Sequence, residues 1–312
     1  MLNRRLLRIK AIKAMYAHLK SDCDSISASE KNLVHSIEKS YHLYNQILTI
    51  IDEVRKLAVT KIEAGKQKHL PTYEDLNPNT KFVDNVVIEK IAECEQLAIF
   101  CQRNSLGWSN YPELIKKIYN NMLRSDYYKA YMAIESRSYV EDLKFVIDFF
   151  TYELEDNELL EEVLLEQSIF WEDDLGYVLS MIVKTLQGCP EKKGLRLMPM
   201  LKSEEDMTYI KDLFCKALIN KDKYMEIIER FSKNWDIDRF AFMDHVIMTA
   251  AVAELINCPT IPVKVTMDEF IEISKYYSTL GSSTFINGVL DKIVDELKKD
   301  GTIVKEGRGL VG

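Results

Sequence analysis

Apolar residues recur at intervals of three and four along nearly the whole chain, and this spacing is what most limits the folds open to it. Such a repeat matches the 3.6-residue turn of an α-helix and gives each segment one apolar face. The clearest run, about seven helical turns long, comprises Leu33, Ile37, Tyr41, Tyr44, Ile47, Ile51, Val54 and Leu57. Glycine and proline number only 11 and 7 in 312 residues, which disfavours turn-rich β-folds. The sequence therefore predicts an all-α fold.

The spacing also predicts where individual helices lie. A segment from Val83 to Phe100 follows the first long helix and is expected to return along it as a long helical hairpin. Further helices are predicted at about 112–133, 139–153, 157–170, 174–186, 204–219, 221–233, 237–257, 267–279 and 283–299. Two glycines and two prolines within 188–199 interrupt the pattern, so we place a boundary there.

Capping residues support the starts of three downstream helices. Ser203 precedes the first, Asp236 precedes the third, and Thr266 with Glu269 has the spacing of a capping box for the fourth. The helix at 237–257 is apolar nearly all round, which is typical of a helix at the centre of a bundle. We expect it to form the core of the carboxy-terminal part.

Residue patterns of the common enzyme and metal sites are absent from the sequence. It has no GxGxxG, P-loop, GxSxG or HExxH motif, and its six cysteines include no CxxC pair. His35 and His42 share a helix face without a carboxylate or thiolate beside them, and the acidic run 153–166 is best interpreted as a solvated helix face. We therefore expect no catalytic residues, no metal and no cofactor.

The sequence also bears on location. No apolar run approaches the roughly 18 residues of a membrane span, and Arg8, Lys10 and Lys13 interrupt any signal-peptide core. Unpaired cysteines fit a reducing compartment. We expect a cytoplasmic protein that does not enter a membrane.

Positive charge is concentrated at the amino terminus of a chain whose formal charge is −8. Residues 1–20 contain six basic side chains and no acidic one, namely Arg4, Arg5, Arg8, Lys10, Lys13 and Lys20. Arg5 and Arg8 continue the apolar stripe of this helix, where a buried position could not hold them unpaired. We therefore expect the first turn to project beyond the core and to offer arginines to phosphates or bases. An ordinary solvated helix start is the alternative.

The last predicted helix carries a second candidate feature. Its buried stripe is expected to be Ile286, Leu290, Ile293 and Leu297. This would leave Phe285 and Lys292 together on another flank. An exposed aromatic ring beside a lysine suits base stacking together with a phosphate contact.

The motifs at both ends of the chain resemble those of the NusB family of transcription antitermination factors. The matching segments are RRLLRIKAIKAMY at the amino terminus and, near the carboxyl terminus, DRFAFMDHVIMTAAVAELI, IPVKVTMDEFIEISKYY and STFINGVLDKI. The resemblance implies an all-helical fold of two packed sub-bundles and a protein that is not an enzyme. It implies binding of boxA-like single-stranded RNA together with a NusE-type small-subunit ribosomal protein. The setting would be an antitermination complex with RNA polymerase during ribosomal RNA synthesis.

The same resemblance implies roles for particular residues. Those placed on RNA are Arg4, Arg5, Arg8, Tyr16, Phe285 and Lys292, and those placed on the partner surface are Tyr16 and Glu254. Because a glutamate is almost never buried unless paired, we expect the Glu254 carboxylate to reach the surface. Thr249, Ala253 and Gly281 depart from the residues common at these positions in the family.

The resemblance also divides the chain. Residues 1–20 would be the opening helix of a NusB-like domain, 21–200 a helical insertion or extension, 201–300 the remaining RNA- and partner-binding part, and 301–312 a tail. Fusion to an RNA methyltransferase would require a glycine-rich Rossmann unit after the last helix, where only about a dozen residues follow. The other alternative is a helical protein-interaction scaffold whose RNA surface has decayed.

Overall fold

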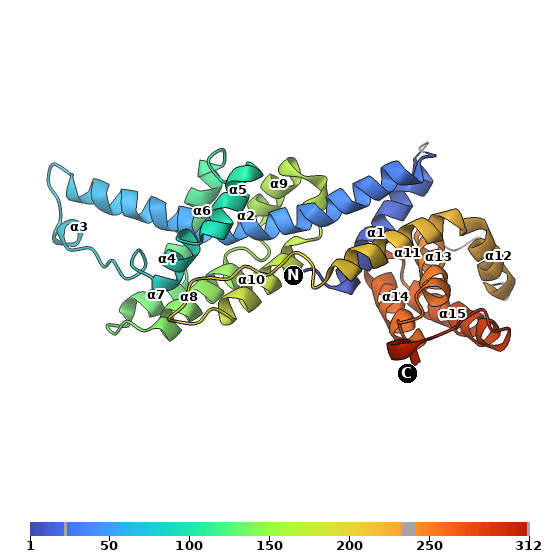
Figure 1. Ribbon diagram of the computed structural model, residues 1–312. Helices are drawn as coiled ribbons and strands as arrows, with labels where there is room; N and C mark the ends of the chain where they lie inside the picture. The colour runs from blue at the N-terminus through green and yellow to red at the C-terminus, as the bar shows by residue number, and fades with distance from the viewer. Residues whose placement is uncertain (22–23, 233–240, 311–312) are drawn as a thin grey trace. The chain divides into compact units, whose positions relative to one another are not determined.

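The computed structural model of the chain describes residues 1–21, 24–232 and 241–310. Within these ranges the secondary structure is helical, and the nearest approach to a β-strand is one isolated bridge between Leu2 and Leu201. The prediction of an all-α fold is confirmed. Contacts divide the chain into two units (Figure 1), which are described separately: unit 1 consists of Met1 and Glu38–Met200, and unit 2 of Leu2–Ile37 and Leu201–Gly312.

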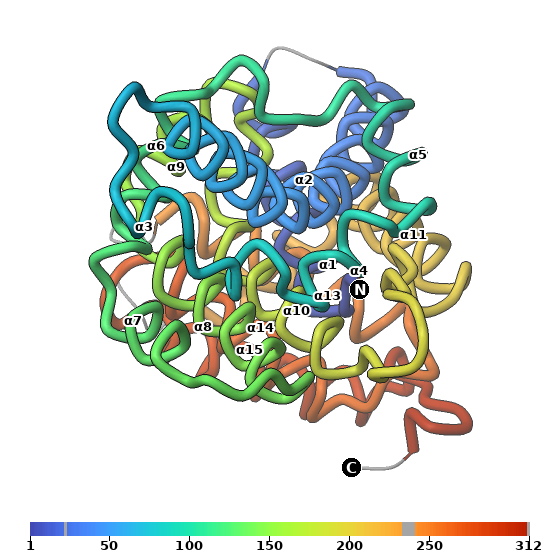
Figure 2. The backbone as a smooth tube through the Cα atoms, turned by 90° about the vertical axis from the view of Figure 1, so that its left-hand side faces the viewer, coloured from blue at the N-terminus to red at the C-terminus, as the bar shows by residue number. Residues whose placement is uncertain are grey.

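Unit 1 is built around the later turns of α2 (Ile26–Lys66) and the helices that follow it. These are α3 (Tyr73–Leu76), α4 (Val86–Ala92), α5 (Glu95–Arg103), α6 (Pro112–Arg124), α7 (Asp126–Ala133), α8 (Tyr139–Tyr152), α9 (Glu158–Gln167) and α10 (Leu175–Gln187), with a 3-10 turn at Ile169–Trp171. Helix α8 packs against α4, α7 and α10, and Figures 1 and 2 both show α8 beside α10. The rings of Phe145, Phe149 and Phe150 are buried in this core.

The predicted hairpin is only partly right. The long helix is present, but the segment 83–100 is split into α4 and α5. Cys94 separates them in an extended conformation (φ −70°, ψ 94°), and its thiol lies 3.8 Å from the Leu195 carbonyl oxygen. This tertiary contact accompanies a break that local helical periodicity does not predict.

Unit 2 is a bundle around one buried helix. Its helices are α1 (Arg4–Lys20), the first turns of α2, α11 (Glu204–Ile219), α12 (Lys221–Ser232), α13 (Phe242–Asn257), α14 (Val263–Tyr277) and α15 (Ser282–Lys299), followed by the 3-10 helix η3 (Gly307–Leu310). Helix α13 contacts α1, α11, α12, α14 and α15, and every residue from Val246 to Leu255 is buried. This confirms the prediction that α13 is the core helix.

Segments far apart in the chain close this bundle. Helix α1 packs against α11 and α13, as the two halves of the resemblance require. The first turns of α2 also join unit 2: Ser29 Oγ lies 2.8 Å from His18 Nδ1, and the Glu30 carboxylate lies 3.6 Å from Lys211 Nζ. Leu33 and Ile37, in the same turns of α2, are fully buried and belong to unit 2.

The helix starts correct some of the sequence-based boundaries. Ser203 is the N-cap of α11, as predicted. Helix α14, however, begins after Pro262, four residues earlier than a cap at Thr266 requires, so the predicted capping box is wrong. Thr266 and Glu269 instead form hydrogen bonds with residues of other helices. Asp236 lies outside the described residues.

Gly281 has a conformational role at the start of α15. It is the N-cap residue and lies in the left-handed region, with φ 92° and ψ −16°. A side chain is strained in that region, so glycine suits this position better than the acidic residue common in the family. Thr249 and Ala253 are both buried, so these two departures lie inside the bundle.

Candidate nucleic-acid interface

Helix α1 brings the amino-terminal arginines to the edge of unit 2. Asn3 caps it by accepting a hydrogen bond from the Leu6 backbone amide at 2.9 Å. Leu6, Leu7 and Ala11 are buried and fix the rotation of the helix. The first turn holds no acidic residue, so the carboxylates that meet its arginines come from distant helices.

Arg8 is held inside the bundle rather than projecting from it. Its side chain is 3% exposed, and Nε and Nη2 donate hydrogen bonds of 2.8 Å to the two carboxylate oxygens of Glu254, whose side chain has no exposed surface. Burial by itself lowers the pKa of Arg8, but the hydrogen bonds and charge of Glu254 outweigh burial and the pKa is raised. The pair joins α1 to α13 through two charge-assisted hydrogen bonds.

Glu254 is the acceptor at the centre of a larger polar cluster. Thr266 Oγ1 donates to it at 2.8 Å, and the Tyr209 hydroxyl also donates to it. Burial raises the pKa of Tyr209, and the neighbouring Glu254 charge raises it further. These contacts satisfy a carboxylate that could not otherwise be buried.

Two predictions about exposure are therefore wrong. Arg8 does not extend beyond the core, and the Glu254 carboxylate does not reach the surface. Each charge is buried because the other pairs with it, which the stripe of α1 alone could not reveal. Glu254→Lys would place an ammonium against Arg8, so this substitution tests folding before it tests partner binding.

Arg4 and Arg5 are paired but remain accessible. Arg5 donates two hydrogen bonds of 2.8 Å to Glu269 while its side chain is 50% exposed. The Glu269 hydrogen bond is the main reason that the Arg5 pKa is raised and the Glu269 pKa is lowered. Arg4 donates to Asp206 at 2.8 Å, and its guanidinium carbon lies 4.9 Å from the centre of the Tyr209 ring.

These arginines line an open groove of about 840 Å³ on unit 2. Arg4, Arg5 and Arg8 contribute from α1, Arg308 contributes from η3, and Glu269 is the acidic residue of the lining. Four arginines and one glutamate give the lining a formal charge of +3 in a chain of −8, and counting Asp206 and Glu254, which pair with Arg4 and Arg8, leaves +1. The groove is therefore a local positive site of the kind that phosphate groups occupy.

The groove lining also includes apolar side chains. These are Ile261 and Pro262, at the turn between α13 and α14, and Val265, in the first turn of α14. Ile261 is buried, whereas Val265 is 41% exposed. A lining that holds both guanidinium groups and an accessible apolar side chain can receive the phosphate and the face of a nucleotide.

Phe285 does not form the predicted stacking platform. It is 3% exposed, and α15 also buries Ile286, Val289 and Leu290. The apolar face of this helix is wider than the single predicted stripe, because it also includes the 285 and 289 positions. Lys292 is exposed, so the two residues do not form one surface feature.

Tyr16 belongs to a separate accessible group on unit 2. It is 36% exposed and meets Phe242 edge to face, with ring centres 5.3 Å apart. The Lys20 ammonium lies 4.1 Å from the centre of the same Phe242 ring. The sequence alone does not indicate that Lys20 lies near Phe242, because their proximity depends on how α1 packs against α13.

Other groove residues were also missed. Asp206 and Glu269 stand in helices predicted from the sequence, but nothing local indicated that they would pair with α1. The position of Tyr209 could have been inferred from that of Asp206, because Tyr209 lies one turn later on the same helix and therefore shares its face. Arg308 lies in the segment that we had described only as a tail.

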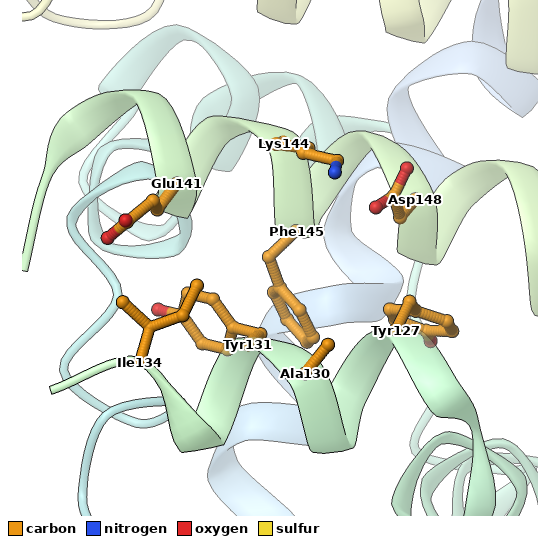
Figure 3. Close-up of a pocket in the computed structure, with 8 residues that line it drawn as sticks. All are labelled: Tyr127, Ala130, Tyr131, Ile134, Glu141, Lys144, Phe145 and Asp148. Atoms are coloured by element: carbon orange, nitrogen blue, oxygen red, sulfur yellow. The ribbon is translucent and has the colours of Figure 1, made fainter.

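Unit 1 has a smaller hollow between α7 and α8, shown in Figure 3, of about 130 Å³. The Phe145 ring forms its floor, with ring centres 4.4 Å from Tyr131 and 5.6 Å from Tyr127. Lys144 lies among the carboxylates of Glu141 and Asp148, so the rim carries both signs of charge. This hollow does not concentrate one charge as the groove of unit 2 does.

Two kinds of feature are absent from the described ranges. No three histidine, cysteine or acidic side chains there are grouped as metal ligands. No helix in the same ranges has both the length and the hydropathy needed to cross a membrane.

Comparison with known proteins places this bundle in a family. The NusB family matches residues 178–295. The transcription antitermination protein NusB of Salinibacter ruber is 40% identical over 114 residues, which cover 36% of this chain and 71% of that protein. The proteins of the same name from Chloroherpeton thalassium and Natranaerobius thermophilus are 44% and 37% identical, over 27% and 29% of this chain and 40% and 66% of their own lengths.

A solved structure of T. maritima NusB is 25% identical to this chain, covers 44% of it and 85% of its own length, and superposes with a TM-score of 0.29. The sequence comparisons carry the assignment without it. The Salinibacter relative exceeds 30% identity across more than two thirds of its length, and the expected motifs stand at both ends of unit 2. The chain, longer than these relatives by its additional helices, belongs to the NusB family.

Proposed function

We propose that this protein is an RNA-binding transcription antitermination factor acting in ribosomal RNA transcription. Its relatives are named transcription antitermination proteins. The ligand we propose is boxA-like single-stranded RNA, bound together with a NusE-type small-subunit ribosomal protein in a complex with RNA polymerase. The protein would act in the cytoplasm by binding, without catalysing a reaction.

The observation that carries this proposal is the arginine-lined groove of unit 2. A guanidinium group has five N–H donors, and the Glu269 contact engages two nitrogen atoms of Arg5. Arg5 therefore retains donors for a phosphate oxygen without first breaking its ion pair. Arg4 is similarly accessible, because its side chain is 40% exposed.

The candidate residues then divide into two roles. Arg4, Arg5 and Lys292 would contact the RNA, and Tyr16 would lie on the surface shared by RNA and partner. Arg8, Glu254 and Phe285 would act indirectly, because they are buried and hold α1, α13 and α15 in place. We further propose that residues 1–20 and 201–300 carry the RNA- and partner-binding role, whereas 21–200 is an insertion that adds a surface of its own.

The protein-interaction scaffold remains a second candidate for one reason. Arg4, Arg5 and Arg8 are each paired with a carboxylate, so part of their charge is already balanced. If these pairs exclude RNA, the surface would serve only protein contacts.

A binding titration separates the two. Wild-type protein and the Arg4→Ala/Arg5→Ala variant are titrated with boxA-like RNA, with and without the NusE-type partner, at two salt concentrations. Log affinity falls with log salt, and each lost phosphate contact should make this negative slope shallower by about 0.7. Lys299→Ala, at an exposed site outside the groove lining, controls for lost charge. Equal RNA binding by wild type and the double variant in every condition would reject the RNA function, and retained partner binding would then favour the scaffold.

A further inference from the structure

The segment after α15 is docked on the bundle although it lies beyond residues 178–295, which match the family. The backbone amide of Ile303 donates to the Leu297 carbonyl at 2.9 Å, so the chain turns back at the end of α15. The backbone amide of Glu306 then donates to the Pro259 carbonyl at 3.0 Å. The tail therefore returns to the turn between α13 and α14, which contributes to the lining of the groove.

Lys305 anchors this return. Its ammonium donates to the carbonyl oxygens of Leu255 and Cys258, at 2.9 and 3.0 Å, at the carboxyl end of α13. Carbonyls at a helix carboxyl end lack helical partners and carry partial negative charge, so a lysine is well suited to this position.

Gly309 allows the close approach that completes the docking. It is buried, and a Cβ atom on it would lie 1.9 Å from the Pro259 carbonyl oxygen. Every other residue type would therefore clash with backbone here. The backbone around Arg308 is thus fixed on one side by Glu306 and on the other by Gly309.

This docking places the Arg308 side chain in the groove with Arg4, Arg5 and Arg8. We propose that the docked tail is a working part of the groove and that Arg308 contacts a phosphate of the bound single-stranded RNA. This inference rests on the proposed function and adds one residue to it. A nucleic acid is favoured over an acidic peptide because the same lining holds apolar side chains, Pro262 and the exposed Val265, that can accept the face of a base.

Two variants test the tail in different ways. Arg308→Ala removes the guanidinium, whereas Gly309→Ala keeps every charge and displaces the backbone that positions Arg308. Both should bind boxA-like RNA more weakly than wild type, and their slope of log affinity against log salt should be shallower by about 0.7. The affinity ratio of wild type to variant should therefore be roughly 2.5-fold smaller at 200 mM salt than at 50 mM salt. Arg308→Lys should keep most of the slope.

Matched controls identify the cause of any loss. Arg230→Ala removes the same charge from an exposed site on α12 that does not line the groove, and its binding should equal wild type. Melting temperatures of all variants establish that they are folded. Should Gly309→Ala fail to fold, Arg308→Ala and Arg308→Lys still decide the question, because Arg308 is exposed.

The outcomes separate this inference from the function on which it rests. If Arg4→Ala/Arg5→Ala weakens RNA binding while Arg308→Ala matches wild type, the tail is not part of the site and the RNA function stands. If all these variants bind as wild type does, the RNA function itself fails. If poly-glutamate binds in an Arg308-dependent way while RNA binding is unaffected, the groove takes an acidic peptide and the inference is overturned.

Discussion

The two units differ in charge and in the partners of particular buried carboxylates. Unit 1 holds 19 basic and 27 acidic residues, a formal charge of −8, whereas unit 2 holds 22 of each. In unit 1, Asp142 and Glu153 accept from phenols: Tyr131 donates to Asp142 at 2.6 Å and Tyr127 to Glu153 at 3.0 Å. In unit 2, Glu254 also accepts from a phenol, that of Tyr209, but it is paired with the buried Arg8 guanidinium as well.

This difference shows why the net charge of the chain is a poor guide to its binding site. The whole excess of negative charge belongs to unit 1, and the arginine-lined groove belongs to the balanced unit. Within unit 2 the ion pairs also orient the arginines, because each carboxylate fixes one side of a guanidinium. The pairs that reduce the charge of the groove therefore also hold its shape.

The largest expected effect comes from breaking the buried ion pair of unit 2. Glu254→Ala should lower the free energy of unfolding by about 3–5 kcal/mol, because the buried Arg8 guanidinium then keeps only the Glu269 carboxylate, 3.8 Å away, as a charged partner. Replacing both residues, as Arg8→Met/Glu254→Leu, should cost much less, since no charge is then left uncompensated. Urea denaturation followed by circular dichroism measures both.

Hydrogen exchange locates that effect. Faster exchange in peptides from α1 and α13, with α7 and α8 unchanged, is the expected result for Glu254→Ala. If Glu254→Ala lowered the free energy of unfolding by less than about 1 kcal/mol, the Arg8–Glu254 pair could not be shielded from water.

Phe285→Ala should destabilise unit 2 by a similar or slightly smaller amount. A phenylalanine buried in a helix face typically contributes about 3–5 kcal/mol relative to alanine. Under our first interpretation, as an exposed stacking residue, the same change would weaken RNA binding by about 1–3 kcal/mol and leave stability intact. Measuring the melting temperature beside RNA affinity separates the two, with Lys299→Ala as the control at an exposed position of the same helix.

The matching test in unit 1 should give a smaller effect. Tyr131→Phe removes one hydrogen bond to Asp142, whose carboxylate still accepts from the Val86 amide at 3.0 Å. We expect a cost of about 1–2 kcal/mol, typical of one buried hydrogen bond to a charged acceptor. Exchange should quicken in α7 and α8 alone. A cost equal to that of Glu254→Ala would remove the distinction drawn between the units.

Most of the helices could be predicted from the sequence, because apolar spacing and caps are local signals. Helix α11 has its predicted bounds and α13 its predicted central place. The polar contacts could not be predicted in the same way. Whether Arg8 is exposed depends on Glu254, which lies 246 residues away, and the tail position of Arg308 depends on a close approach to Pro259. The sequence identified the arginines but not the carboxylates that bury or orient them.

The smallest expected effect concerns the pair at the mouth of the groove. Glu269→Gln removes the acidic charge from the lining and leaves Arg5 more available to phosphate. RNA affinity should therefore rise modestly, with a steeper salt dependence, whereas stability near neutral pH should fall by at most about 1 kcal/mol because the pair is partly exposed.

The pKa of Glu269 is lowered from its usual value of 4.5, chiefly by the hydrogen bond from Arg5. Its contribution to stability is thus present above about pH 4.5 and is lost as the pH falls through the lower folded-state pKa. Denaturation of wild type and Glu269→Gln from pH 7 to pH 3 should show their free energies of unfolding converging at the acid end. A difference that persists unchanged at pH 3 would mean that Glu269 contributes through packing rather than through its charge, and its removal would then say nothing about how Arg5 is held.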